Sequence, residues 1–208
     1  MFITFEGING SGKTTQSRKL FEYLNGIGKD VVLTKEPGGG GEYCMSLREI
    51  LLKTKNMSKL AELFLLYSAR VEHIKNVIGP ALKAGKIVIC DRYIDSTFAY
   101  QCVGDKEMDE IVEYLNDKIK LVIPDITFLI DIPVSVSESR LAPLVYEAII
   151  KGEGYKKYDE IETSNMQKIV DSYRKIATNN SDRVKIIDGT LDKNEIHKKI
   201  VSIVSSYF

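Results

Sequence analysis

The stretch Gly7-Ile8-Asn9-Gly10-Ser11-Gly12-Lys13-Thr14 decides the fold, because it satisfies the pattern G-x-x-x-x-G-K-[ST]. It follows the short apolar run Phe2–Phe5 and precedes a helical pattern that begins near Lys13. In this setting glycines let backbone N–H groups wrap around phosphates, and the helix N-terminus adds partial positive charge. Lys13 can reach the β- and γ-phosphates, while the Thr14 hydroxyl can ligate Mg²⁺. All eight residues are therefore expected to bind ATP or GTP.

Strand and helix patterns alternate along the rest of the chain. Further strands are expected at Val31–Leu33, Ile87–Cys90, Thr127–Ile130 and Val184–Ile187. Helices are expected from Lys13 to about Gly26 and at Ser46–Lys53, Leu60–Lys83 (with Pro80 interrupting it or starting a new segment), Glu107–Lys118, Ser164–Ala177 and Asn194–Ser205. Strands that are apolar at nearly every position favour a parallel sheet covered on both faces. We therefore expect an α/β fold of the P-loop NTPase type: one domain, residues 1–208, with a doubly wound five-stranded parallel sheet and helices on both faces.

The composition indicates which kinds of binding partner and which cellular compartment to expect. The 29 basic and 29 acidic residues balance, so no overall field favours nucleic acid or an acidic membrane. Three cysteines without metal-type spacing favour buried thiols in a reducing compartment. The start of the chain, Met1–Glu6, lacks a secretory signal pattern, and no apolar run approaches the roughly 20 residues that span a bilayer. A cytoplasmic protein without nucleic-acid or membrane partners is expected.

Five further motifs, in this order, resemble the thymidylate kinase family. They are Lys35-Glu36-Pro37-Gly38-Gly39, Leu47-Arg48, Tyr67-Ser68-Ala69-Arg70, Asp91-Arg92-Tyr93 running on to Tyr100-Gln101, and Pro124–Asp131. Each is modest alone, but their order along nearly the whole chain is specific. The resemblance implies a flexible lid, Mg²⁺·ATP as phosphate donor, dTMP as acceptor and a homodimer.

The choice of arginine at three motif positions has a chemical reason. The chain holds seven arginines against 22 lysines, yet Arg48, Arg70 and Arg92 fall on the motifs. A guanidinium presents a planar fork to phosphate or carbonyl oxygens, which an ammonium cannot copy. A solvent-exposed surface position, or an ion pair with Glu72 or Asp91, is the ordinary alternative for any one of them.

The resemblance gives the donor-side residues their catalytic roles, with Lys13, Arg92 and Asp91 as the catalytic set. Arg92 follows a buried strand and is expected to clamp the phosphoryl groups between donor and acceptor. Asp91 is expected to hold Mg²⁺ through water, together with Thr14. Asp131 also ends an apolar strand and competes for the metal, but it could instead cap a helix that starts near Val134.

On the acceptor side, the resemblance assigns Arg48 to the monophosphate and Arg70 with Gln101 to the edge of the thymine. Thr97 and Tyr100 are expected to line the deoxyribose and base. The Glu36–Pro37 peptide is expected to be cis, which would turn Glu36 toward the acceptor. Leu66 occupies a position where the family commonly stacks an aromatic ring on thymine.

The family pattern is incomplete in the phosphate-binding loop, where Asn9 replaces an acid and Gly10 provides no arginine. Positive charge is therefore expected from a lid at about 142–162, a stretch with little structural pattern of its own. Lys156 and Lys157 are the candidates there, and Arg140 is the runner-up.

The function expected from these features is transfer of the ATP γ-phosphoryl group to dTMP, giving dTDP for DNA precursor synthesis. A kinase for another nucleoside monophosphate or for a deoxynucleoside is the nearest alternative. A P-loop module that binds ATP and regulates a partner is the alternative from another class. Arginines placed for an acceptor argue against the regulatory module.

Overall fold

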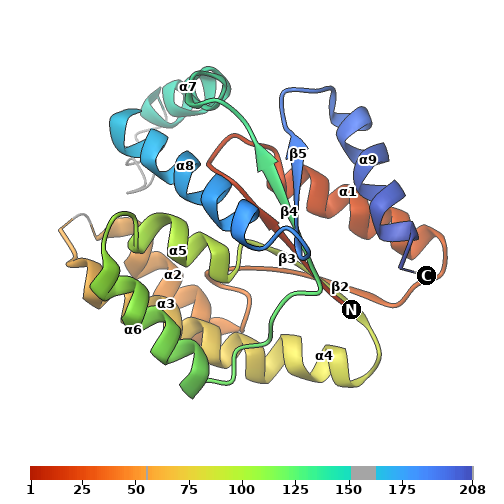
Figure 1. Cartoon of the computed structure of the whole chain (residues 1–208), viewed down its shortest axis with the longest axis horizontal. Helices are drawn as coiled ribbons and strands as arrows, with labels where there is room; N and C mark the ends of the chain where they lie inside the picture. The colour runs from red at the N-terminus through yellow and green to blue at the C-terminus, as the bar shows by residue number, and fades with distance from the viewer. Residues whose placement is uncertain (55, 151–162, 208) are drawn as a thin grey trace.

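The computed structural model describes residues 1–54, 56–150 and 163–207, and its centre is a five-stranded sheet (Figure 1). All neighbouring strands pair in parallel, in the order β2-β3-β1-β4-β5. The strands are β1 (Phe2–Glu6), β2 (Val31–Lys35), β3 (Ile87–Asp91), β4 (Ile126–Asp131) and β5 (Val184–Asp188). Each lies within a residue or two of an expected strand, which confirms the five-stranded α/β prediction.

Helices connect the strands. They are α1 (Lys13–Gly26), α2 (Glu42–Lys53), α3 (Lys59–His73), the π-helix η1 (Ile74–Ile78), α4 (Gly79–Lys83), α5 (Ile94–Gln101), α6 (Lys106–Lys118), α7 (Val134–Ile150), α8 (Thr163–Asn179) and α9 (Lys193–Ser205). Side chains cap several of them: Ser58 accepts from the Ala61 N–H at the start of α3, and Asp105 accepts from the Met108 N–H at the start of α6. Such caps satisfy backbone donors that the first helical turn leaves unpaired. None of the described helices is both long and apolar enough to cross a bilayer.

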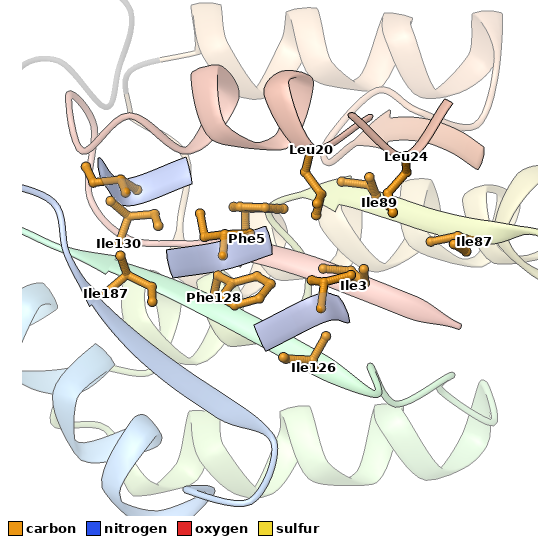
Figure 2. Packing of buried hydrophobic residues seen from close by; sticks show 13 residues of the cluster. Ile3, Phe5, Leu20, Leu24, Ile87, Ile89, Ile126, Phe128, Ile130 and Ile187 are labelled. Carbon is orange, nitrogen blue, oxygen red and sulfur yellow. The ribbon is translucent and has the colours of Figure 1, made fainter. Parts of the chain in front are cut away.

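The sheet is covered on both faces, as the doubly wound prediction requires. Leu20 and Leu24 of α1 pack with Ile200 of α9 on the strand residues Phe5 and Phe128, and all five side chains are buried (Figure 2). The opposite face carries α3, α4, α5, α6 and α8, whose apolar residues form two further clusters. The three central strands, β1, β3 and β4, are buried on both sides, which explains why nearly every position in them is apolar.

Three helical regions differ from expectation. The expected helix 60–83 is divided at Ile74 by the π-helix, and a new helix, α4, begins at Gly79 with Pro80 in its first turn, which confirms that Pro80 starts a new segment. Helix α5 had no sequence prediction of its own. The view that residues 142–162 lack structural pattern is wrong for the first part, because α7 continues to Ile150 with Pro143 inside it. A proline normally breaks a helix, since it lacks an N–H and clashes with the preceding turn.

Candidate active site

The phosphate-binding loop lies between β1 and α1, at the carboxyl edge of the sheet. Gly7 has a φ of 134°, and a Cβ there would lie 2.5 Å from the carbonyl oxygen of Ile130. Only glycine therefore lets the chain turn this close to β4. Gly12, also in the left-handed region, forms the N-cap of α1. Backbone N–H groups at such a helix start form an anion site.

Lys13 is buried inside this loop, with 6% of the residue exposed. Its Nζ donates to the Ile8 carbonyl at 2.7 Å and to Ser11 Oγ at 3.3 Å. Burial, helped by the nearby charge of Arg92, lowers the pKa of Lys13 to about 7. A phosphate group beside this amine would favour its charged form.

Thr14, in the first turn of α1, contacts Asp91 at the end of β3. The Thr14 hydroxyl donates to Asp91 Oδ2, and Asp91 lies opposite Phe5 in the parallel register. Asp131, the competing acid, instead accepts from Arg174 Nε of α8 at 3.0 Å. The structure thus joins Asp91, and not Asp131, to the hydroxyl proposed for Mg²⁺.

Arg92 directly follows β3, and its backbone φ is 71°. Its side chain extends to the phosphate-binding loop. Its guanidinium donates at 2.7–3.4 Å to oxygen atoms of Gly7, Asn9, Ser96, Tyr100 and Tyr173. It also lies over the Tyr100 ring, 5.2 Å from the centroid. Burial alone would lower the pKa of Arg92, but Tyr100, Tyr173 and two carboxylates raise it above its ordinary value, so the side chain stays charged.

Sequence reasoning did not name Glu6, Ser96 and Tyr173, which form a hydrogen-bonded group next to Arg92. Glu6 accepts from Ser96 Oγ at 2.5 Å, from the Tyr93 N–H at 2.7 Å and from Tyr173 Oη at 3.2 Å. Burial, with the charge of Asp95, raises the pKa of Glu6 to about 7. An acid that ends a buried strand directly before Gly7 is a signal that could have identified it. Tyr173, 167 residues away, gives no such local signal.

A second group of polar side chains lies buried beside the first. Arg70 donates through Nε to Glu36 Oε2 at 2.9 Å and through Nη2 to Thr97 Oγ1 at 3.0 Å. Tyr67 and Tyr93 present their ring faces to its guanidinium. Among the described residues, Arg70 Nη1 is buried without a hydrogen-bond partner. The partner of Arg70 is thus Glu36, and neither Glu72 nor Asp91.

The other acceptor-side residues surround this pair less directly. The Glu36–Pro37 peptide is cis, as expected, and Arg48 donates to the Pro37 carbonyl at 2.7 Å. Gln101 is buried and donates to Glu62 Oε1 at 2.8 Å. Leu66 is half-buried on α3. The structure therefore brings Glu36, Arg70 and Thr97 into direct contact, while Gln101 belongs to a neighbouring pair.

Of the residues expected to supply lid charge, Arg140 lies in the described part of the chain. Its guanidinium is exposed and donates to the Gly10 carbonyl at 3.1 Å and to the Gly189 carbonyl at 2.9 Å. Lys156 and Lys157 lie outside the described residues. Arg140 thus contacts the backbone of the phosphate-binding loop from α7.

A parallel sheet in this order, with the G-x-x-x-x-G-K-T loop after β1, defines the P-loop nucleoside-triphosphate-binding fold. Residues 5–200 match the family model described as thymidylate kinase. The chain belongs to the thymidylate kinase family. It is therefore a nucleoside monophosphate kinase, a phosphotransferase whose family implies ATP as donor.

Curated relatives and a solved structure agree with this family over almost the whole chain. A thymidylate kinase of Wolbachia sp. subsp. Brugia malayi is 44% identical over 99% of this chain and 96% of its own length. A thymidylate kinase of Sulfurihydrogenibium sp. is 45% identical over 96% of this chain and 94% of its own length. The crystal structure of the Ehrlichia chaffeensis thymidylate kinase superposes with a TM-score of 0.77 at 36% identity, covering 98% of both chains.

Proposed function

We propose that this enzyme transfers the γ-phosphoryl group of Mg²⁺·ATP to dTMP, giving ADP and dTDP. A phosphate oxygen of dTMP would attack the γ-phosphorus, while the bond from that phosphorus to the β–γ bridging oxygen breaks. The observation that carries this acceptor is the buried guanidinium of Arg70, which Glu36 holds with Nη1 unpaired among the described residues. A donor in such a site favours a base that presents a carbonyl over one that presents an amino group.

On the donor side, the chain's own groups supply position and charge. The backbone N–H groups of residues 7–14 and the start of α1 would hold the β- and γ-phosphates. Lys13 Nζ lies inside this loop, and Arg92 reaches the loop from β3. Because phosphoryl transfer spreads charge over the γ-phosphoryl oxygens, two cations fixed beside them would stabilise the transition state.

The oxygen atoms of Thr14 and Asp91 fit Mg²⁺ by their chemistry. Mg²⁺ prefers oxygen ligands and usually keeps several waters, with one or two protein groups and the substrate phosphates completing its shell. The described residues contain no cluster of three or more acidic, histidine or cysteine side chains. That composition suits a metal that arrives with the nucleotide. When bound, it would neutralise charge on the β- and γ-phosphates.

On the acceptor side, Arg70 would face the thymine carbonyl edge, with Gln101 further along the pocket. Thr97 and Tyr100 would line the sugar and base, Leu66 would pack on the ring, and Arg48 would bind the monophosphate. Glu36 keeps Arg70 oriented. We further propose one kinase domain, 1–208, with 142–162 as a lid that begins within α7 and brings Arg140, Lys156 and Lys157 toward the phosphates.

A coupled ADP-release assay with a panel of acceptors tests the assignment. dTMP should give the highest kcat/KM, with dUMP lower by about 10- to 200-fold because it lacks one methyl contact. UMP, dCMP, AMP and thymidine should be poor acceptors. Equal turnover of UMP and dTMP would contradict the acceptor assignment. Steady ATP hydrolysis without any acceptor would instead favour a regulatory ATPase.

We also propose that the enzyme forms a homodimer through α3. Leu60, Phe64 and Val71 lie on one face of this helix and are 41%, 52% and 39% exposed. Exposed apolar residues gathered in this way are typical of a protein interface. Phe64→Glu should give a monomer by light scattering after size exclusion. Ile186→Glu is the matched control, since Ile186 is equally exposed on β5; a dimeric Phe64→Glu protein would exclude this interface.

The cysteines support a cytoplasmic location. Cys44, Cys90 and Cys102 are buried free thiols. Unpaired thiols of this kind suit a reducing compartment.

A further inference from the structure

His73 is a buried polar side chain to which the proposed function gives no role. It is the last residue of α3 and is 1% exposed. Arg70 precedes it by three residues, so both side chains leave the same face of the helix. Both reach the same carboxylate, Glu36, in the loop after β2.

The hydrogen bonds form a line from the edge of the sheet to the base site. Thr34 Oγ1 lies 2.7 Å from His73 Nε2, and His73 Nδ1 lies 2.9 Å from Glu36 Oε1. The other carboxylate oxygen, Oε2, accepts from Arg70 Nε at 2.9 Å and lies 2.8 Å from Arg70 Nη2. The carboxylate thus holds the Nε–Nη2 edge of the guanidinium. Nη1 is therefore the guanidinium nitrogen that does not face Glu36.

The buried charges of Glu36 and Arg70 depend on the hydrogen bonds of this line. Burial alone would raise the pKa of the Glu36 carboxyl, but Arg70 and His73 bring it below its ordinary value. Glu36 is therefore a buried anion, balanced by the cation of Arg70. A buried carboxylate is stable only when hydrogen bonds satisfy both of its oxygens. Arg70 satisfies Oε2, and His73 Nδ1 can donate to Oε1.

The loop that carries Glu36 also encloses the imidazole ring. A Cβ at Gly39 would lie 2.4 Å from Thr34 Oγ1 and 2.6 Å from His73 Nε2. A Cβ at Gly40 would lie 2.8 Å from the backbone nitrogen of His73. The glycines after Pro37 therefore allow the loop to close over His73 and fix the direction of its ring.

We propose that His73 is a positioning residue for the acceptor base. It holds one oxygen of Glu36, so that the carboxylate plane aligns Arg70 with Nη1 directed to a base carbonyl. This role rests on the proposed function, because it needs a base at Arg70.

Two amide variants separate positioning from mere packing. In His73→Asn the side-chain nitrogen can occupy the place of Nδ1 and still donate to Glu36. In His73→Gln the nitrogen extends toward the place of Nε2 and the donor to Glu36 is lost. Both variants bury one amide and differ by a single methylene, so they should lose similar stability. Cys44→Ala is the control, because Cys44 of α2 lies beside Gly40 of the same loop and donates to the Ala69 carbonyl of α3, but contacts neither Glu36 nor His73 through a hydrogen bond.

Steady-state kinetics with dTMP and ATP varied separately give the readout. His73→Asn should keep the KM for dTMP within about threefold, whereas His73→Gln should raise it about tenfold or more, since a charge-assisted bond is lost. The KM for ATP should change less than twofold in both, and Cys44→Ala should change neither KM. Equal KM values for dTMP in the two amide variants, or a parallel rise in the KM for ATP, would overturn the role of His73. A wild-type enzyme that prefers another monophosphate would contradict the proposed function alone, and the two variants would then be compared on that acceptor.

Discussion

Replacing Lys13 by methionine should abolish activity and yet make the nucleotide-free protein more stable at pH 7. The pKa of Lys13 falls from 10.5 to about 7 in the fold. At 1.36 kcal/mol per unit, keeping the ammonium charged in this site costs about 5 kcal/mol. Its hydrogen bond to the Ile8 carbonyl, at 2.7 Å, returns about 2–3 kcal/mol, and the longer contact with Ser11 Oγ, at 3.3 Å, returns about 1 kcal/mol. Methionine fills a similar volume without charge, so the free energy of unfolding should rise by the remainder, about 1–2 kcal/mol.

The pH dependence of this difference follows from the protons that each state binds. Between pH 7 and 10.5 the unfolded chain keeps a proton on Lys13 that the folded chain has lost, so wild-type stability rises with pH in this window. Below pH 7 both states are protonated and the cost is complete. By pH 9 the cost has fallen by about 2 kcal/mol, which is enough to remove the stability advantage of the variant.

Urea denaturation without nucleotide, at pH 7 and pH 9, measures both quantities. Lys53→Met is the control, since the Lys53 side chain is 76% exposed and its charge is solvated. Added ATP should stabilise the wild type by about 2.7 kcal/mol at 100 times Kd and leave Lys13→Met unchanged. A Lys13→Met protein that unfolds at lower urea at pH 7, or a difference that is the same at both pH values, would refute the reasoning.

Three further predictions concern the charges around the transferred group. Arg92→Lys should lower kcat by about 10²–10³ with little change in either KM, because an ammonium cannot reproduce the fork; near wild-type turnover would remove Arg92 from the mechanism. Asp91→Asn should raise the Mg²⁺ concentration for half-maximal rate about tenfold, and an unchanged Mg²⁺ titration would exclude Asp91 as the metal's partner. Alanine variants of Arg140, Lys156 and Lys157, assayed at saturating ATP and dTMP, should include at least one with kcat reduced about tenfold, since a cation near the phosphates stabilises developing charge. Full kcat in all three would mean that the lid supplies no charge.

Local patterns were sufficient for the sheet and for the phosphate-binding loop. The strands are apolar because helices cover both faces, and Gly7 to Thr14 carry a pattern whose spacing reflects backbone geometry. Motif positions also predicted that Glu36 and Arg70 belong to one site. The strands and the phosphate-binding loop are local or periodic features, so a single sequence reveals them, whereas Glu36 and Arg70 are 34 residues apart and were placed together by the family resemblance.

Features that depend on distant partners could not be predicted in this way. Helix α5 buries Asp95, whose carboxylate pairs with Arg183 at 2.7 and 2.8 Å, 88 residues away. A helix with a buried acid and no apolar stripe has no period to detect. Tyr173 reaches Glu6 across 167 residues. Helix α7 continues through Pro143 into a stretch for which the sequence predicted little structural pattern.

The three buried cysteines have a practical consequence for following motion in this enzyme. Burial raises the pKa of each thiol, to about 12 for Cys102 and well above the ordinary value for Cys90. Because the thiolate is the reactive form, alkylating reagents must wait for local opening. Cys44 lies in the contact between α2 and α3, Cys90 in the central sheet, and Cys102 at the end of α5. The alkylation rate of each native cysteine therefore reports how often its own part of the fold opens, and no residue has to be introduced for the measurement.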